Sequence, residues 1–190
     1  MAASGVKEGG RLGPFQYEDL LNMPDDGRRY EVIEGELAVS PSPKWWHQRL
    51  VVRMIAFLAR AEAADFGQAG TAPMDVVLAE HSVVQPDAFF IARPHLGIAA
   101  EDHVRGAPDL VIEVVSPSSR RRDVITKRRI YERFGVRHYW IVDPDEETVR
   151  ALTWKDGAYT EPVTLRAGDA LTCPLFPGIA QAVSDLFARA

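Results

Sequence analysis

The sequence predicts a mixed α/β (α+β) fold in which a mixed β-sheet is flanked by helices, with added N-terminal and C-terminal β-hairpins. Three observations support this class. The chain has 190 residues, which at about 100–200 residues per domain fits one domain, expected over 14–190 after a loose Gly-rich tail over 1–13. Hydrophobic residues make up 46% and charged residues 26%, an ordinary globular mix. Strand-like and helix-like segments are interleaved along the chain.

The expected order is hairpin, helix, three strands, helix, strand and hairpin. A short helix over Phe15–Met23 precedes Arg29–Ile33 and Glu36–Ser40, which are typical of a β-hairpin turning at Glu34-Gly35. The strongest helix signal covers His47–Phe66, where apolar residues recur at steps of one, three and four. Glycines after this segment are expected to end the helix.

The middle of the chain favours strands. Asp75–Ala79 and Val83–Ala92 are expected to be strands separated by the turn Glu80-His81-Ser82, and Arg93–Gly106 is expected to be loop. Asp109–Val115 is almost continuously apolar, which is typical of a strand buried on both faces.

The last third begins with a predicted helix over Arg120–Phe134, followed by a buried strand over His138–Val142. Val149–Trp154 and Ala158–Leu165 are expected to form a hairpin. A short helix is expected over Ile179–Ala188.

Composition narrows the class of protein. Cys173 is the single cysteine, which excludes an intrachain disulfide and a cysteine-based zinc site. No apolar run approaches the roughly 18 residues of a membrane span, and the first residues lack the apolar stretch of a signal peptide. We therefore expect a soluble, cytoplasmic protein without a membrane partner. The net charge of −5 argues against a surface coated with basic charge for indiscriminate nucleic-acid binding.

Two acidic residues stand inside apolar segments. Glu113 interrupts the predicted strand Asp109–Val115, and Asp87 lies within Val83–Ala92. Because a buried carboxylate must be paired, protonated or bound to a metal, two such acids in one sheet could converge on a divalent cation. The alternative is that each acid forms a structural salt bridge or faces water at a strand end.

The following predicted helix adds basic and polar candidates. Asp123, Lys127 and Tyr131 are four residues apart and share one helical face. Lys127 could point over the end of the Glu113 strand and contact a developing oxyanion or a nucleophilic water. The alternative is an Asp–Lys pair on the surface, worth about 0.3–0.5 kcal/mol.

Basic residues are concentrated in the same segment. From Arg120 to Arg133 there are seven basic residues against two acidic ones. Arg120, Arg121 and Arg122 at its start could bind phosphate, or they could form a solvated face.

Several short motifs together resemble a known family. They are listed in chain order: Tyr30-Glu31-Val32-Ile33-Glu34-Gly35-Glu36-Leu37, Ser40-Pro41, His47, Gln85-Pro86-Asp87, Gly106-Ala107-Pro108-Asp109-Leu110, Ile112-Glu113-Val114-Val115-Ser116-Pro117, Asp123, Lys127, Tyr131, Gly135 and Tyr139-Trp140-Ile141-Val142-Asp143-Pro144. This pattern resembles the Uma-two-type restriction endonuclease family of the PD-(D/E)XK nuclease superfamily. The resemblance implies a restriction-endonuclease-like core, in agreement with the predicted element order.

The resemblance assigns roles residue by residue. Pro86-Asp87 resembles the PD of the superfamily motif, and Glu113 resembles its (D/E). Val115 stands where the simple motif has lysine, and Lys127 matches the lysine that this family carries on the following helix. Either Glu31 or Glu34 could supply a further acid, or both could be structural, with Glu31 at a strand edge and Glu34 in a turn.

The implied chemistry is metal-assisted hydrolysis of phosphodiester bonds. Asp87 and Glu113, with a backbone carbonyl near Val114, would hold Mg²⁺ or Mn²⁺. Lys127 would orient the attacking water or stabilise the charge of the transition state. The remaining candidates are Gln85, which could contact water or phosphate, His47, which could face the site, and Tyr131, which would pack against or position Lys127.

The leading hypothesis is therefore a Mg²⁺- or Mn²⁺-dependent DNA endonuclease. If one metal site per chain cuts a duplex, a homodimer is expected. The alternatives are a catalytically inactive nuclease-fold module that binds DNA or a protein partner, and a metal hydrolase that acts on RNA or another phosphate ester.

Overall fold

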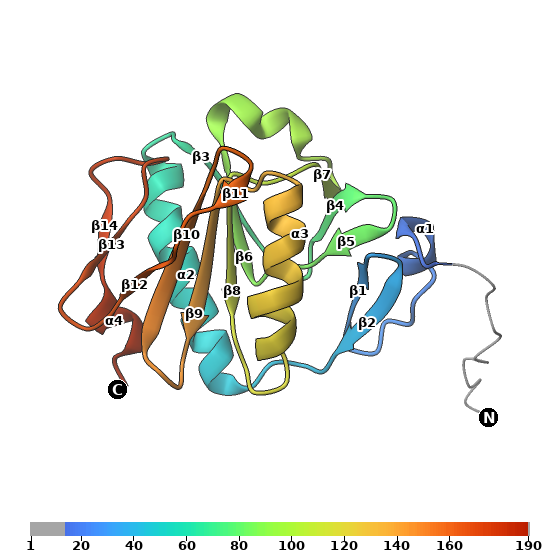
Figure 1. The fold of residues 1–190 in the computed structure, drawn as a ribbon, viewed down its shortest axis with the longest axis horizontal. Coiled ribbons are helices and arrows are strands. Elements are labelled where there is room, and N and C mark those ends of the chain that lie inside the picture. Colours follow the sequence, from blue (N-terminus) through green and yellow to red (C-terminus); the bar gives the residue numbers. More distant parts are fainter. Residues whose placement is uncertain (1–13, 190) are drawn as a thin grey trace.

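The computed structural model of the protein describes residues 14–189 (Figure 1). The tail expected over 1–13 lies outside the described residues. Within the described part, two main β-sheets, a small two-stranded sheet and a few helices form the mixed architecture that the sequence predicts. None of the described helices is long and apolar enough to cross a membrane.

The larger sheet is mixed and carries the residues of interest. Its strand order is β11-β10-β9-β8-β6-β3, with β12 paired to β10. The β8–β9 pair is parallel, whereas the other pairs are antiparallel. The bounds are Gly67–Thr71 (β3), Ala88–Ala92 (β6), Leu110–Val114 (β8), His138–Asp143 (β9), Thr148–Lys155 (β10), Ala158–Tyr159 (β11) and Val163–Leu165 (β12).

Helices cover both faces of this sheet (Figure 1). On one face, α2 (Trp45–Ala63) buries its apolar side in the same cluster as Leu110 and Ile112 of β8. On the other face, α3 (Arg128–Arg133) packs Ile130 with Val111. Because side chains alternate along a strand, Glu113 is directed to the same face of the sheet as Val111, which is the α3 side.

The smaller sheet lies beside the first and has the order β2-β1-β5-β4-β7. Its strands are Arg29–Ile33 (β1), Glu36–Ser40 (β2), Asp75–Ala79 (β4), Ser82–Val84 (β5) and His103–Arg105 (β7). The predicted β1–β2 hairpin is confirmed, and Glu34 and Gly35 form its turn with φ angles of 52° and 86°.

The predicted strand Val83–Ala92 is wrong as a single strand. The segment is divided into β5 and β6, which belong to different sheets, and Gln85-Pro86-Asp87 links them. Pro86 has no backbone N–H to give to a sheet, which favours a break at this point. The break places Asp87 between the two sheets instead of inside a strand.

Strand β3 was not expected, because Gly67 and Gly70 were interpreted as the end of a helix. The two glycines are instead required by close packing against β6. A Cβ atom at Gly67 would lie 2.1 Å from the carbonyl oxygen of Ile91, and one at Gly70 would lie 2.1 Å from the Phe89 ring.

Other boundaries also differ from the prediction. The first helix is only Tyr17–Leu20 (α1), and the predicted loop Arg93–Gly106 contains a 3-10 helix, η1 (Arg93–Ile98), as well as β7. The C-terminal segment predicted as one helix holds β14 (Ala180–Ala182), paired with β13 (Ala170–Thr172), and then α4 (Val183–Phe187).

The predicted helix Arg120–Phe134 is confirmed, with one local change. It begins with a π-helical stretch, η2 (Arg122–Lys127), before it continues as α3. Single π-helical turns are rare in proteins and occur often at functional sites.

Candidate active site

A cavity of about 490 Å³ opens where the two sheets, α2 and the π-helical stretch meet. The elements that line it come together at the lower edge of Figure 1, where α2 begins and β8 ends. Its charged and histidine side chains are Arg29, Glu31, Lys44, His47, Asp87, Glu113, Arg122, Asp123, Lys127 and Asp145. Asp87, Glu113 and Lys127, which lie far apart in the sequence, are therefore brought together.

Asp87 is buried and held by positive and neutral donors. Its Oδ1 lies 2.6 Å from Nη1 of Arg29, and its Oδ2 lies 3.1 Å from Nε2 of His47. The backbone N–H of Val114 donates to Oδ2 at 2.8 Å. Burial alone would raise the pKa of Asp87, but His47, Arg29 and the Val114 N–H lower it to about 2. Asp87 is therefore a carboxylate at neutral pH.

Glu113 has a different balance of contacts. Its Oε1 accepts hydrogen bonds from Nζ of Lys127 at 2.8 Å and from the hydroxyl of Tyr131 at 2.7 Å. In residues 14–189 no hydrogen bond reaches its Oε2. Burial raises the pKa of Glu113 to about 8, and the nearby acids Asp123, Asp87 and Glu31 add to the effect although Lys127 opposes it.

Lys127 lies between two acids. Its Nζ is 2.7 Å from Oε1 of Glu31 and 2.8 Å from Oε1 of Glu113. Burial alone would lower its pKa, but Glu113, Glu31 and Asp123 raise it above the usual range. The side chain is therefore a buried ammonium ion that compensates more than one carboxylate.

The structure separates the two alternative acids of the hairpin. Glu31 lines the cavity, and it also accepts the backbone N–H of Gln85 at 2.9 Å. Glu34 lies on the surface and forms an ion pair with Arg133 at 2.8 Å. Only Glu31 is close enough to join the group around Lys127.

Asp123, Lys127 and Tyr131 do share one face, as their spacing predicts. A surface Asp–Lys pair is excluded, because Asp123 and Lys127 are both buried. Burial raises the pKa of Asp123, although Lys127 and Ser119 oppose the shift. Asp123 is therefore a further acid in the cavity. Its spacing of four residues from Lys127 already indicated that the two side chains share one face of the helix.

The three arginines at the start of this helix have separate environments. Arg120 pairs with Asp143 at 2.5 Å and lies 3.5 Å from Asp145. Arg121 is exposed outside the cavity, whereas Arg122 lines it and donates to Oγ of Ser40 at 2.6 Å.

Other predicted residues lie at the edge of this arrangement. The side-chain amide of Gln85 donates to Asp75 at 2.9 Å, and Gln85 does not line the cavity. Tyr131 donates its hydroxyl hydrogen bond to Glu113 but does not itself line the cavity. Arg29 was not predicted as a site residue. It could have been inferred from its position two residues before Glu31, because this spacing places both side chains on one face of β1.

Several cavity residues carry buried nitrogen atoms without a hydrogen-bond partner. In the described part of the chain they include Nε of Arg29, Nε1 of Trp46, Nδ1 of His47 and Nε of Arg122. Buried polar groups are normally paired, so a group of unpaired ones around one cavity indicates that water or an anionic ligand completes the site.

The donor chemistry fits a hard divalent cation. In residues 14–189 no group of three or more His, Cys, Asp or Glu side chains is placed so that it could hold a metal ion. Mg²⁺ does not require three protein ligands, because it is commonly bound by one or two carboxylates, with water and substrate phosphate as further ligands. Asp87 and Glu113 supply carboxylate oxygens of this kind in one cavity.

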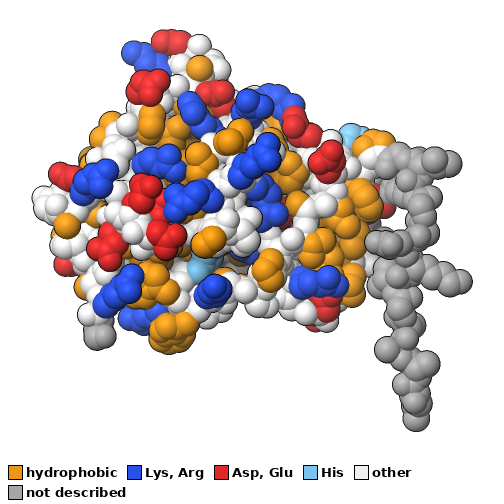
Figure 2. Space-filling view, turned by 60° about the horizontal axis from the view of Figure 1, so that its bottom comes forward, with side chains coloured by type: hydrophobic (Ala, Val, Ile, Leu, Met, Phe, Trp, Pro, Cys, Tyr) orange, Lys and Arg blue, Asp and Glu red, His pale blue; other side chains and the backbone are white. Residues whose placement is uncertain are grey.

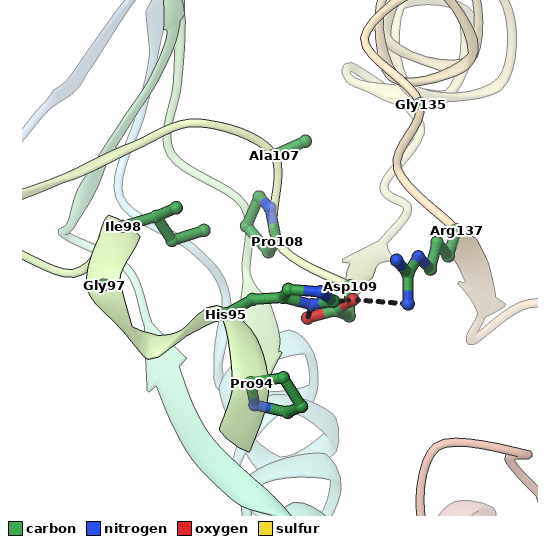
Figure 3. Close-up of a pocket in the computed structure, with 9 residues that line it drawn as sticks. All are labelled: Pro94, His95, Gly97, Ile98, Ala107, Pro108, Asp109, Gly135 and Arg137. Carbon is green, nitrogen blue, oxygen red and sulfur yellow. Dashed lines mark hydrogen bonds and ion pairs between the residues drawn. The ribbon is translucent and has the colours of Figure 1, made fainter.

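A second cavity, of about 440 Å³, lies at the other end of β8 and contains none of the predicted site residues (Figure 3). Its buried acid, Asp109, accepts the backbone N–H of Ala92 at 2.8 Å and contacts Nδ1 of His95 at 2.9 Å. Arg137 approaches from the opposite side at 3.5 Å. These contacts connect η1 with the beginnings of β8 and β9.

Comparisons with known proteins agree with this architecture. A solved structure described as a putative nuclease belonging to DUF820, from Anabaena variabilis ATCC 29413, has a TM-score of 0.77 with 19% identity. The match covers 92% of this chain and 98% of that chain, and it shows that the two share a fold. No curated protein shows significant similarity to the sequence. The family model described as "Uma2: Putative restriction endonuclease" matches residues 17–184, so the chain belongs to the Uma2 family.

Proposed function

We propose that the protein is a Mg²⁺- or Mn²⁺-dependent endonuclease that hydrolyses phosphodiester bonds in DNA. The observation that carries the proposal is the meeting of Asp87, Glu113 and Lys127 in one cavity, from three separate parts of the chain. The family description and the nuclease description of the structural relative support it.

The two acids have the properties expected of metal ligands. Asp87 and Glu113 would hold the cation, which supplies a water of lowered pKa and neutralises charge on the scissile phosphate. Because burial raises its pKa to about 8, Glu113 takes up a proton more readily than an ordinary glutamate, and protonation competes with cation binding. A nearby divalent cation favours the charged form of a carboxyl group, so cation binding and Glu113 ionisation support each other.

Lys127 is placed to act on the reacting groups. Its ammonium group keeps its proton, because the acids around it raise its pKa. It can therefore donate to the attacking water or to a phosphate oxygen that gains negative charge. Glu31 and Tyr131 are positioning residues in this scheme: Glu31 contacts Nζ of Lys127, and Tyr131 holds the same oxygen of Glu113 that Lys127 contacts.

The cavity also offers donors for the rest of the phosphate. Arg29, His47 and Arg122 have buried nitrogen atoms without partners, and Lys44 lines the same cavity. Arginine and lysine are common phosphate ligands, and these four residues can hold the oxygen atoms that do not react.

The test is cleavage of plasmid and oligonucleotide DNA with Mg²⁺ or Mn²⁺. We expect wild-type protein to cut DNA, and Glu113→Gln to be at least about 100-fold slower, since it removes a charge from the reacting centre. Asp109→Asn is the matched control, because it changes the buried acid at the other end of β8. Cleavage that is equal in wild type and Glu113→Gln would refute the proposal.

One observation favours a non-catalytic alternative. Asp87 and Glu113 already have partners within the chain, since Arg29 and His47 contact Asp87 and Lys127 contacts Glu113. A nuclease-fold module that only binds DNA or a protein could use a site whose acids are paired in this way. The same assay decides, because the alternative predicts no cleavage with either metal.

A further inference from the structure

We propose that the protein cuts DNA at unpaired nucleotides, in single strands or single-stranded flaps, rather than within intact duplex. The proposal rests on the proposed function and names its substrate class. It is carried by an exposed tryptophan, Trp45, which stands in the chain between two residues that line the cavity, together with the depth of the acidic groups and the charge of the surrounding surface.

The groups proposed to react lie deep in the protein. The side chains of Asp87, Glu31, Glu113 and Lys127 are only 3–4% exposed. The phosphates of a duplex lie along the outside of a stiff rod with a persistence length of about 50 nm. A flexible single strand can bend one phosphate into a cavity of about 490 Å³ with much less deformation.

Some exposed apolar side chains belong to the chain segments that form the cavity. The large hydrophobic side chains that are exposed in the described part of the chain are Leu21, Val39, Trp45, Val52, Ile125 and Val163. Val39 lines the cavity itself. Trp45 stands in the chain between the lining residues Lys44 and Trp46, at the first residue of α2. Unpaired bases offer flat apolar faces to such a surface, whereas a duplex keeps its bases stacked.

The two neighbouring tryptophans differ in a way that supports this role. Trp46 packs against the core, and Arg53 and Arg189 lie over its ring. Trp45 is 74% exposed, and its ring has Arg49 at 5.9 Å from the ring centroid. A base stacked on Trp45 would therefore lie beside a cation that can contact its phosphate.

The surface charge is unsuited to a long duplex. The chain has a net charge of −5, and Figure 2 shows Lys and Arg side chains interspersed with Asp and Glu on the face that comes forward from the bottom of Figure 1. Duplex binding draws most of its affinity from many phosphate contacts along a basic surface. Here the cavity itself holds Arg29, Lys44 and Arg122, which suits a few phosphates of one strand.

The first experiment measures binding in EDTA, by fluorescence anisotropy, of a 5′-labelled single strand, its duplex and a duplex with a single-stranded flap. We expect the strand and the flap to bind at least about tenfold more tightly than the duplex. Trp45→Ala should weaken strand binding about tenfold without changing duplex binding, and Trp45→Phe should largely restore it. Leu21→Ala is the control, since Leu21 is also an exposed apolar side chain and neither lines the cavity nor adjoins a lining residue in the chain.

Equal or tighter binding of the duplex would overturn the proposal. So would a Trp45→Ala variant that binds the single strand as tightly as wild type, or wild-type protein that binds no DNA. If Trp45→Ala instead changed the mass of the protein measured by sedimentation and left its DNA affinity unchanged, the surface around Trp45 would be a protein interface.

The second experiment measures cleavage of the same three DNAs with Mg²⁺. Trp45→Ala should raise KM for the single strand with little change in kcat, because the residue binds a base and not the reacting phosphate. Equal cleavage of strand and duplex would refute the substrate class and leave the nuclease function standing. No cleavage above the level of Glu113→Gln would refute the nuclease function, and the binding preference would still be measured independently.

Discussion

Strand β8 carries a buried acid near each end, and the two acids have opposite surroundings. Asp109, at the first end, is held by a backbone N–H, a histidine and an arginine, so that it joins three chain segments. Glu113, at the other end, shares a cavity with Glu31, Asp87 and Asp123, and one of its oxygen atoms receives both described hydrogen bonds. Burial of an acid therefore does not by itself indicate a reactive site.

The two ends of β8 differ in how many of their polar groups lack a hydrogen-bond partner. The contacts of Asp109 involve both of its carboxylate oxygens, as expected of a structural acid. Around Glu113, like charges accumulate and nearby nitrogen atoms lack partners. In the proposed function, such a site would bind a cation and an anion together, as metal-assisted phosphate chemistry requires.

The largest effect is expected from removing the buried ammonium group. Lys127→Met should destabilise the fold by about 3–5 kcal/mol, because it leaves Glu31 and Glu113 without their shared cation. Urea unfolding at pH 7 measures this change, and Lys127→Arg, which keeps the charge, should lose less. Stability equal to wild type in Lys127→Met would show that the acids are not compensated by this residue.

A smaller loss of stability is expected at the other end of β8. Asp109→Asn should cost about 1–3 kcal/mol, because it replaces a charged acceptor of several hydrogen bonds. The folded fraction should still cleave DNA at the wild-type rate. Thermal unfolding and cleavage measured on the same preparation check both parts, and a specific loss of activity in folded protein would contradict the structural role.

Glu113→Gln should show a dependence on pH instead of a simple loss of stability. Because the pKa of Glu113 is raised from 4.5 to about 8, its stabilising contribution is present below about pH 4.5 and is lost as the pH rises through about 8. Wild type should therefore lose stability relative to Glu113→Gln across this range and level off above it. Denaturant unfolding at several pH values measures the difference, and a constant difference would contradict the raised pKa.

The smallest effects concern the arginines that precede α3. Arg122→Gln should reduce the log–log salt dependence of DNA binding by about one unit, since Arg122 lines the cavity. Arg120→Gln should leave the slope nearly unchanged, because Asp143 already neutralises Arg120. Equal slopes in both variants and wild type would show that Arg122 belongs to a solvated face.

Local patterns predicted the elements that depend on neighbouring residues. The β1–β2 hairpin, the long helix α2, the strands β8 and β9 and the helix after β8 follow from turn residues and apolar periodicity. Strand β3 was missed, because Gly67 and Gly70 pack against residues of β6 that lie 19 to 25 positions later in the sequence.

The residues of the candidate site, like the elements of the fold, could be predicted only in part. Acids inside apolar runs drew attention to Glu113 and Asp87, and helical spacing drew attention to Lys127. The resemblance then assigned a role to each of the three. The choice of Glu31 over Glu34 and the pairing of Arg29 with Asp87 depend on how the two sheets meet, which no local pattern encodes. The break at Pro86 that brings Asp87 between the sheets was likewise hidden within an apparently continuous strand.

The central claim is that the Glu113 end of β8, and not the Asp109 end, binds a divalent cation. Calorimetric titration of the folded protein with Mn²⁺ tests it most directly. We predict binding by wild type and by Asp109→Asn, and loss of that binding in Asp87→Asn and in Glu113→Gln. Absence of Mn²⁺ binding by wild type, or binding that survives both substitutions in the cavity, would contradict the account.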